Sequence, residues 1–224
     1  MIRFVNVTKS YDEHAALDNI NLHIKVGEFV FLVGPSGAGK SSIMQLLYRE
    51  EKPSDGQVLV GGVDVSRIPT SQVPILRRRM GIVFQDFKLL PKQSVYDNVS
   101  YVIRALGMGS KEIDMRVKGA LKVVGLPHKI KSKPDELSGG EQQRISIARS
   151  IVNGPPLLIC DEPTGNLDPQ NSFEIMEILE QINQRGTTVV VSTHDEAIVN
   201  HFKKRVVTLD HGQIIRDVYA GTYS

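Results

Sequence analysis

Residues 34–41 read Gly-Pro-Ser-Gly-Ala-Gly-Lys-Ser and match the spacing G-x-x-x-x-G-K-[ST], which is typical of a loop that wraps a phosphate group. The apolar run 29–33 predicts a buried strand before this loop, and 41–49 predicts a helix after it. Backbone N–H groups of the loop and of the helix N-terminus would converge on a phosphate, and the Lys40 ammonium would add positive charge near its β and γ oxygens. The Ser41 hydroxyl is expected to reach Mg²⁺; the plain alternative is a glycine turn beside a surface lysine. The candidate nucleotide contacts are Gly34, Ser36, Gly37, Ala38, Gly39, Lys40, Ser41 and Ser42.

Two carboxylates follow a second apolar run. Residues 157–160 predict a buried strand, and Asp161 and Glu162 come directly after it, where an α/β sheet places its ligand site. Asp161 is expected to hold Mg²⁺ through its water shell, whereas Glu162 is expected to orient or deprotonate an attacking water. The alternative is a capping or surface role, which would leave a bound nucleotide without its metal partner.

A third motif, Ser138-Gly139-Gly140, precedes a predicted helix that runs through Ile145 and Ala148. Taken alone, it is either a helix N-cap with room for close backbone approach or a second anion site. The residues leave both interpretations open.

The strands that must position these side chains indicate an α/β protein. Residues 20–26 alternate between apolar and polar types, as in a strand with one wet face. Short apolar runs at 81–84, 157–160 and 187–192 predict further buried strands, and 205–217 predicts a hairpin.

Helical spacing dominates the middle of the chain. It covers residues 95–107 and 111–125, with Gly107 and Gly125 as expected stops. We therefore expect an all-helical insertion at about 88–150 inside an α/β domain.

The composition is that of an ordinary globular protein, with 224 residues, 41% of them hydrophobic and 23% charged, and a formal net charge of +2. This charge balance argues against a polycationic nucleic-acid coat, so no nucleic-acid partner is expected. No apolar run approaches the ~20 residues that span a bilayer, and the single cysteine, Cys160, cannot form an internal disulfide. We expect a chain that stays in a reducing cytoplasm and reaches a membrane only through a partner.

Taken together, these motifs resemble the nucleotide-binding domain of the ABC ATPases. The resemblance rests on the loop at 34–41, the Ser138 motif, the strand that ends at Asp161 and Glu162, and His194 beyond a further strand. It implies an α/β P-loop NTPase fold with an antiparallel β subdomain and an inserted α-helical subdomain, and an ATP hydrolase that uses Mg²⁺. The implied organisation is a single domain, with an α/β lobe at 1–87 and 151–224 and a helical subdomain at about 88–150.

The resemblance also implies roles for single residues. Tyr11 matches the aromatic residue that stacks on adenine, with a strand aromatic in the core as the alternative. Gln85 matches the glutamine that contacts Mg²⁺ and the attacking water, and His194 matches the histidine that contacts the γ-phosphate. Residues 165–168, Gly-Asn-Leu-Asp, match the loop that crosses the dimer interface, although many members carry Ser-Ala-Leu-Asp there.

A homodimer follows from the same resemblance. Ser138, Gly139 and Gly140 would close on ATP bound by another copy, so that two ATP molecules lie between head-to-tail subunits. ATP would close this dimer and hydrolysis would loosen it, which makes a two-state switch.

Further segments are similar to the members of the family that act in bacterial cell division, namely 47–50, 73–78, 84–90, 95–99 and 161–168. This similarity implies an integral membrane partner of the FtsX kind, a role in regulating peptidoglycan hydrolysis, and a peripheral location at the cytoplasmic face of the bacterial membrane. Phe87, Leu89 and Leu90 are expected to dock a cytoplasmic helix of that partner, with core packing as the alternative. The nearest rivals are the ATPases of lipoprotein-release and MacB-type exporters, which share the form of 165–168.

Overall fold

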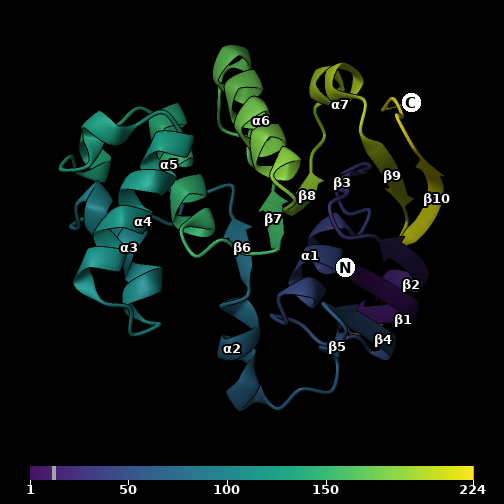
Figure 1. The fold of residues 1–224 in the computed structure, drawn as a ribbon. Coiled ribbons are helices and arrows are strands. Elements are labelled where there is room, and N and C mark those ends of the chain that lie inside the picture. The colour runs from purple at the N-terminus through teal and green to yellow at the C-terminus, as the bar shows by residue number, and fades with distance from the viewer. Residues whose placement is uncertain (12–13, 224) are drawn as a thin grey trace.

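The computed structural model describes residues 1–11 and 14–223 and contains two sheets with helices packed against them (Figure 1). The strands are β1 (Ile2–Tyr11), β2 (His14–Ile24), β3 (Phe29–Val33), β4 (Asp55–Val60), β5 (Val63–Asp64), β6 (Met80–Val83), β7 (Leu157–Asp161), β8 (Thr188–Ser192), β9 (Arg205–Asp210) and β10 (Gln213–Val218). The α-helices are α1 (Lys40–Leu47), α2 (Val73–Arg77), α3 (Val95–Arg104), α4 (Ser110–Val123), α5 (Gly139–Ile151), α6 (Pro169–Gln184) and α7 (Glu196–Phe202). Over the residues described, no helix combines the length and the apolar character needed to cross a bilayer.

The larger sheet has the strand order β10-β9-β3-β8-β7-β6. Strand β3 pairs in parallel with β8 and β9, and β7 pairs in parallel with β6 and β8. The carboxyl ends of β3, β7 and β8 therefore meet at one edge, which receives the loop at 34–41, the carboxylates after residue 160 and His194. The predicted α/β fold class and the predicted hairpin, formed by antiparallel β9 and β10, are confirmed.

Every residue of β3 is buried because its two faces pack into different parts of the core. Phe29, Phe31 and Val33 join a cluster with side chains of α3, α4, α5 and α6. Val30 and Leu32 join a second cluster with α1 and the smaller sheet. A strand covered on both sides needs apolar residues at every position, which is the pattern that predicted it.

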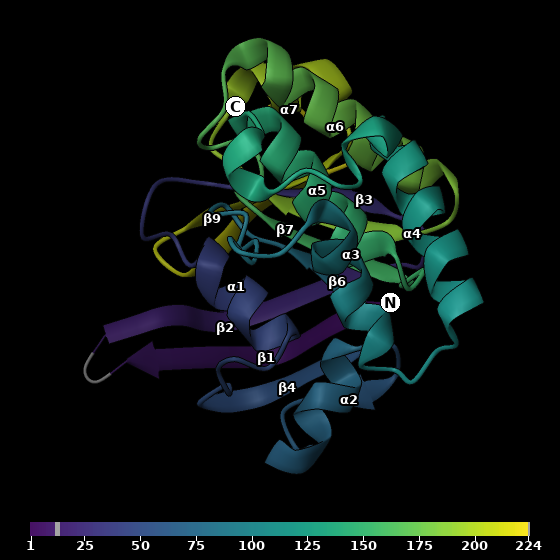
Figure 2. The same cartoon turned by 90° about the vertical axis from the view of Figure 1, so that its left-hand side faces the viewer.

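The smaller sheet is antiparallel, with the order β2-β1-β4-β5, and lies on the α1 side of the molecule (Figure 2). The strand predicted at 20–26 is the second half of β2, which ends at Ile24. The turn that follows contains Gly27, whose positive φ of +77° suits glycine.

The described chain between β6 and β7 contains helices and no strand, in keeping with the predicted all-helical insertion. Helix α3 ends at Arg104, and α5 runs to Ile151, one residue past the expected limit of the insertion. The division into lobes at 1–87, about 88–150 and 151–224 stays a prediction.

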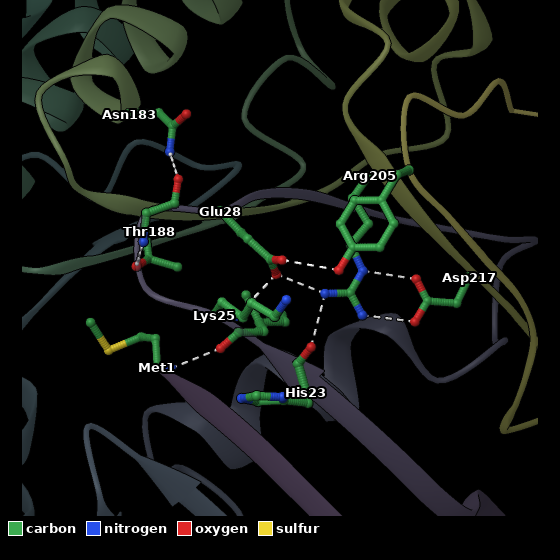
Figure 3. Close-up of polar contacts among 11 residues, drawn as sticks. Met1, His23, Lys25, Glu28, Asn183, Thr188, Arg205 and Asp217 are labelled. Atoms are coloured by element: carbon green, nitrogen blue, oxygen red, sulfur yellow. Dashed lines mark hydrogen bonds and ion pairs between the residues drawn. The ribbon is translucent and has the colours of Figure 1, made fainter.

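Arg205 forms ion pairs with Asp217 and Glu28 and a hydrogen bond with the His23 carbonyl (Figure 3). This network joins the two sheets beside the first residue of β3, at the opposite end of that strand from the phosphate loop. The guanidinium of Arg205 donates to both carboxylate oxygens of Asp217 at 2.8 and 2.7 Å, to Glu28 at 2.7 Å and to the His23 carbonyl at 2.8 Å. Arg205 is buried. A single guanidinium thus ties β2 to β9, to β10 and to the residue that precedes β3.

Replacing Arg205 with Met is expected to destabilise the fold by roughly 1.5–3 kcal/mol, because it leaves the partly buried carboxylate of Glu28 and the exposed carboxylate of Asp217 without their shared cation. Urea unfolding followed by circular dichroism measures the loss. The matched control is Arg67→Met, since Arg67 forms an exposed pair with Asp64 at 3.4 Å and its loss is expected to cost under about 0.5 kcal/mol. Equal midpoints for the two variants would contradict the assigned role of the network.

The difference between wild type and Arg205→Met is expected to shrink in acid. Burial alone would raise the pKa of Glu28, but the Lys25 N–H and the Arg205 guanidinium outweigh burial and hold this pKa below its ordinary value. A carboxylate whose pKa is lower in the folded state contributes stability above its unfolded pKa and loses it as the pH falls through the folded pKa. Unfolding measured over that acidic range checks this direction.

Candidate nucleotide and hydrolysis site

The loop after β3 approaches the neighbouring backbone so closely that a side chain does not fit at two of its glycines. Gly34 has a φ of +142°, and a Cβ there would lie 2.1 Å from the carbonyl oxygen of Leu209. Gly39 has a φ of +106°, and a Cβ there would lie 2.7 Å from the carbonyl oxygen of Ala16. The loop is therefore pressed against β9 and β2.

Helix α1 opens on this loop with its N-terminus free. Within the described residues it has neither a side-chain cap nor an acidic residue in its first turn. Four other helices start at a side chain that accepts a hydrogen bond from their own backbone, namely Ser94, Ser138, Asp168 and Asp195. The unpaired N–H groups and the positive end of the α1 dipole thus point into the loop, as an anion site requires.

The Lys40 side chain is buried inside the loop, with 7% of its surface exposed. Its ammonium donates to the carbonyl oxygens of Gly34 at 2.8 Å and Pro35 at 2.9 Å. A bound phosphate offers the same ammonium a charged acceptor, which makes a stronger hydrogen bond than a neutral carbonyl.

A pocket of about 650 Å³ lies in front of the loop. It brings together nine of the residues predicted from the sequence: Gly34, Ser36, Gly37, Gly39, Lys40, Ser41, Ser42, Glu162 and His194. Ala16, Pro35 and Tyr223 complete its lining and were not predicted. Ala38 is buried beneath the loop, with 2% exposed.

Asp161 and Glu162 are held at the end of β7 by Ser192, the last residue of β8. The Ser192 hydroxyl donates to Asp161 Oδ1 at 2.6 Å and accepts from the Glu162 N–H at 2.9 Å. Sequence reasoning missed Ser192; the available signal was a polar residue that ends an apolar strand at the same sheet edge. Burial raises the pKa of Asp161, and the Ser192 hydrogen bond and the positive charge of Lys40 oppose this shift.

Glu162 has a left-handed backbone, with a φ of +44°. This conformation is strained for a residue other than glycine, and the two hydrogen bonds from its N–H to Ser192 hold it in place. The turned backbone brings Glu162 Oε1 to within 3.4 Å of His194 Nδ1, and both side chains line the pocket. The arrangement offers a carboxylate and an imidazole to a molecule bound at the loop.

The oxygen ligands present fit Mg²⁺ held mainly by a nucleotide. Ser41 supplies a hydroxyl and Asp161 a carboxylate, which are hard ligands, and Mg²⁺ commonly takes one or two protein carboxylates together with substrate phosphates. Across residues 1–11 and 14–223 no group of three or more His, Cys, Asp or Glu side chains gathers to hold a metal without such a substrate.

Gln85 lies outside this pocket, against the loop at 165–168. A Cβ at Gly165 would be 2.9 Å from Gln85 Nε2, and the Asn166 side chain donates to the Gln85 carbonyl at 3.4 Å. The structure therefore places Gln85 beside the predicted dimer-crossing loop, and its assigned contact with Mg²⁺ and water stays a prediction.

Tyr11 ends β1 with 40% of its surface exposed, so the alternative of a core aromatic is wrong. Its hydroxyl donates to Gln45 Oε1 at 3.3 Å, and the Lys9 ammonium lies 4.5 Å from the ring centroid. Tyr11 does not line the pocket, and adenine stacking stays a prediction.

Ser138 is the N-cap of α5 and forms a capping box with Glu141. Its hydroxyl accepts from the Glu141 N–H at 3.3 Å, and the Glu141 carboxylate accepts from the Ser138 N–H at 2.9 Å. Ser138, Gly139 and Gly140 do not line the pocket. A single chain thus holds the phosphate loop and the Ser138 motif apart.

The fold and this site define the chain as a P-loop ATPase of the cassette type, and the chain belongs to the ABC transporter family, whose model matches residues 17–165. Members of this family hydrolyse ATP, and the chain is an ATP hydrolase of this class. Among its relatives is the cell division ATP-binding protein FtsE of Bacillus subtilis, which is 52% identical over 100% of this chain and 98% of that protein. The protein of the same name from Mycobacterium tuberculosis is 50% identical over 100% of this chain and 98% of its own length.

Solved structures agree with this family. The ATP-binding cassette MJ0796, described as a dimer in a post-hydrolysis state bound to ADP and Pi, matches with a TM-score of 0.89 and 35% identity over 99% of both chains. The cbiO1 protein of Clostridium perfringens matches with a TM-score of 0.91 and 34% identity over 98% of this chain and 88% of that one.

Proposed function

We propose that this chain is the ATP-hydrolysing subunit of a membrane ABC complex that acts in bacterial cell division. One observation carries the ATPase part of the proposal: the free N-terminus of α1, the buried Lys40 ammonium and the Glu162 carboxylate meet at the same pocket. The cell-division part is supported by relatives of that name that match over the whole length of this chain.

Residues that line the pocket and residues outside it share the proposed reaction. The loop N–H groups and the Lys40 ammonium bind the β and γ oxygens of ATP, while Tyr11 stacks on the adenine. Ser41 and Asp161 would hold Mg²⁺, assisted by Gln85, and the ion would supply positive charge beside the phosphates.

Glu162 orients the attacking water and accepts its proton, and His194 contacts the γ-phosphate. The water oxygen bonds to the γ-phosphorus as the bond to the β–γ bridging oxygen breaks, which releases ADP and phosphate.

A head-to-tail homodimer accounts for the separation between the phosphate loop and the Ser138 motif. In this arrangement Ser138, Gly139 and Gly140 of one copy contact the ATP bound by the other, so that two ATP molecules lie between the subunits. The dimeric state of a solved relative supports this arrangement.

An FtsX-like integral membrane protein is the partner that we propose, and it would hold the chain at the cytoplasmic face of the membrane and regulate peptidoglycan hydrolysis. The structure exposes one of the expected docking leucines and packs the other against the core. Leu90 is 38% exposed, and its backbone is fixed by Asn98, which accepts from the Leu90 N–H at 2.7 Å and donates to its carbonyl at 3.1 Å. Leu89 instead packs against the main core. Leu90 is therefore the better residue with which to test docking.

Replacing Leu90 with Ser is expected to abolish co-purification with the membrane partner while the melting temperature stays near that of wild type. The Asn98 hydrogen bonds use the backbone of residue 90, so the loop keeps its shape when the side chain changes. Affinity purification from native membranes, followed by identification of the bound protein, measures the loss. Cells with this variant are expected to be chained or misshapen.

Two variants serve as controls for this experiment. Leu89→Ser is expected to lower the melting temperature because it removes a side chain that packs against the core. Met115→Ser removes a 66% exposed apolar side chain on α4 and is expected to keep the partner. A folded Leu90→Ser protein that still binds the partner would place the docking surface elsewhere.

The alternative, an ATPase of a lipoprotein-release or MacB-type exporter, is not favoured by the relatives. Proteins named for cell division match at 44–52% identity over nearly all of this chain. A partner identified as a lipoprotein exporter in the same purification would reverse this preference.

A further inference from the structure

Helix α5 makes an unusual polar contact at the end opposite Ser138. Arg149, in its last turn, donates to the carbonyl oxygen of Lys88 at 2.5 Å and to that of Phe87 at 2.7 Å. Within the described part of the chain Arg149 has no carboxylate at ion-pair distance, and burial lowers its pKa. Apart from a long hydrogen bond to the Ser146 hydroxyl at 3.5 Å, this half-buried cation therefore donates to two backbone carbonyls.

The two residues that it holds are themselves strained. Phe87 and Lys88 have φ values of +55° and +52°, and neither is a glycine. Left-handed backbone at two successive residues of this kind persists only where the surroundings hold it. Arg149 supplies that restraint, since it binds the carbonyls of both residues at once.

The same short segment carries Gln85, two residues before Phe87. The side chain of Gln85 lies against Gly165, in the loop that follows Glu162. A second residue of α5, the buried Gln143, donates to the carbonyl of Pro163 at 2.6 Å, directly after Glu162. Helix α5 is thus bonded to both segments that carry the residues proposed to handle the attacking water.

We infer that Arg149 is a positioning residue for ATP hydrolysis. It fixes the segment that carries Gln85 to α5. Gln85 therefore reaches its working position only when α5, whose other end is Ser138, is correctly placed. The inference rests on the proposed function and assigns Arg149 no contact with ATP. The ATPase rate then depends on Arg149 through Gln85, whereas the affinity for ATP does not.

The test compares Arg149→Met, which keeps the aliphatic stem and removes all donors, with Arg149→Lys, which keeps a charge and a donor. The matched control is Arg144→Met on the same helix, because the partners of Arg144 lie on α6, namely Glu174 at 3.0 Å and Asn171 at 3.5 Å. We expect kcat to fall roughly 10- to 100-fold in Arg149→Met, to recover in part in Arg149→Lys, and to stay within about twofold in Arg144→Met. The Kd for ATP is expected to change less than about twofold in all three.

A double-mutant cycle separates positioning from general damage. If Arg149 acts through Gln85, then adding Arg149→Met to Gln85→Ala lowers kcat no further. Additive losses would overturn the inference, as would wild-type kcat in Arg149→Met.

Hydrogen exchange on the nucleotide-free protein tests the restraint without hydrolysis. Amides of residues 86–90 are expected to exchange at least about fivefold faster in Arg149→Met and unchanged in Arg144→Met. Unchanged exchange in both variants would overturn the inference even in an active enzyme. If the wild-type chain does not hydrolyse ATP, the proposed function fails, and the exchange result still decides whether Arg149 holds the segment.

Discussion

Replacing Glu162 with Gln is expected to leave ATP bound and to slow its hydrolysis by about 10²- to 10⁴-fold, the usual cost of losing a general base. The amide has the size of the carboxylate and keeps its place beside His194, 3.4 Å away in the wild type, but it cannot accept a proton from water. The proposed phosphate contacts lie on the loop and on α1, so the substitution leaves them intact. The variant should therefore accumulate as an ATP-bound dimer, which gel filtration with and without ATP detects.

Glu196→Gln is the matched control for Glu162. Glu196 is an exposed carboxylate in the first turn of α7, two residues beyond His194, and it does not line the pocket. Its variant is expected to hydrolyse ATP at the wild-type rate. Near-normal phosphate release by Glu162→Gln would show that another group activates the water.

The second large effect is expected for Lys40→Ala, which should weaken ATP binding itself by roughly 10- to 100-fold. Hydrogen bonds to charged groups contribute about 1.5–3 kcal/mol, and the Lys40 ammonium is the charged donor buried in the loop. The backbone N–H groups remain, so binding is weakened rather than abolished. Titration calorimetry with ATP measures the change.

Lys25→Ala is the control for charge alone, since Lys25 is exposed and lies outside the pocket. Its ATP affinity should equal that of wild type. Melting temperatures of both variants separate lost binding from lost fold. An unchanged Kd for Lys40→Ala in a folded protein would remove Lys40 from the site.

The sequence predicted those parts of the fold in which burial or lack of space restricts the residue type at each position. β3 and β8 are covered on both faces, so their apolar runs identify them directly. The loop at 34–41 is recognised by spacing because Gly34 and Gly39 occupy positions where no Cβ fits. In contrast, β4, β5 and α2 are only partly buried, so their residues show no clear apolar period.

Contacts between distant segments account for what the sequence could not predict. Ser192 holds Glu162 only because β7 and β8 are neighbours in the sheet, with Asp161 opposite Ser192. Arg149 binds backbone carbonyls, which every residue possesses, so no spacing of residue types marks its partners. Leu89 and Leu90 are identical in type and adjacent, and packing alone decides which of them remains exposed.

Because Glu162 has a left-handed backbone, the residue type that would best stabilise the fold at this position differs from the one that the proposed hydrolysis needs. Holding a residue other than glycine in such a conformation costs roughly 1–3 kcal/mol, a cost that glycine avoids and asparagine reduces. Selection for heat resistance alone would therefore drive this position towards Gly or Asn, and the enzyme would lose its proposed base as it became harder to unfold. An effort to engineer a more robust version of this chain would do well to keep residue 162 fixed and to look for its gains elsewhere.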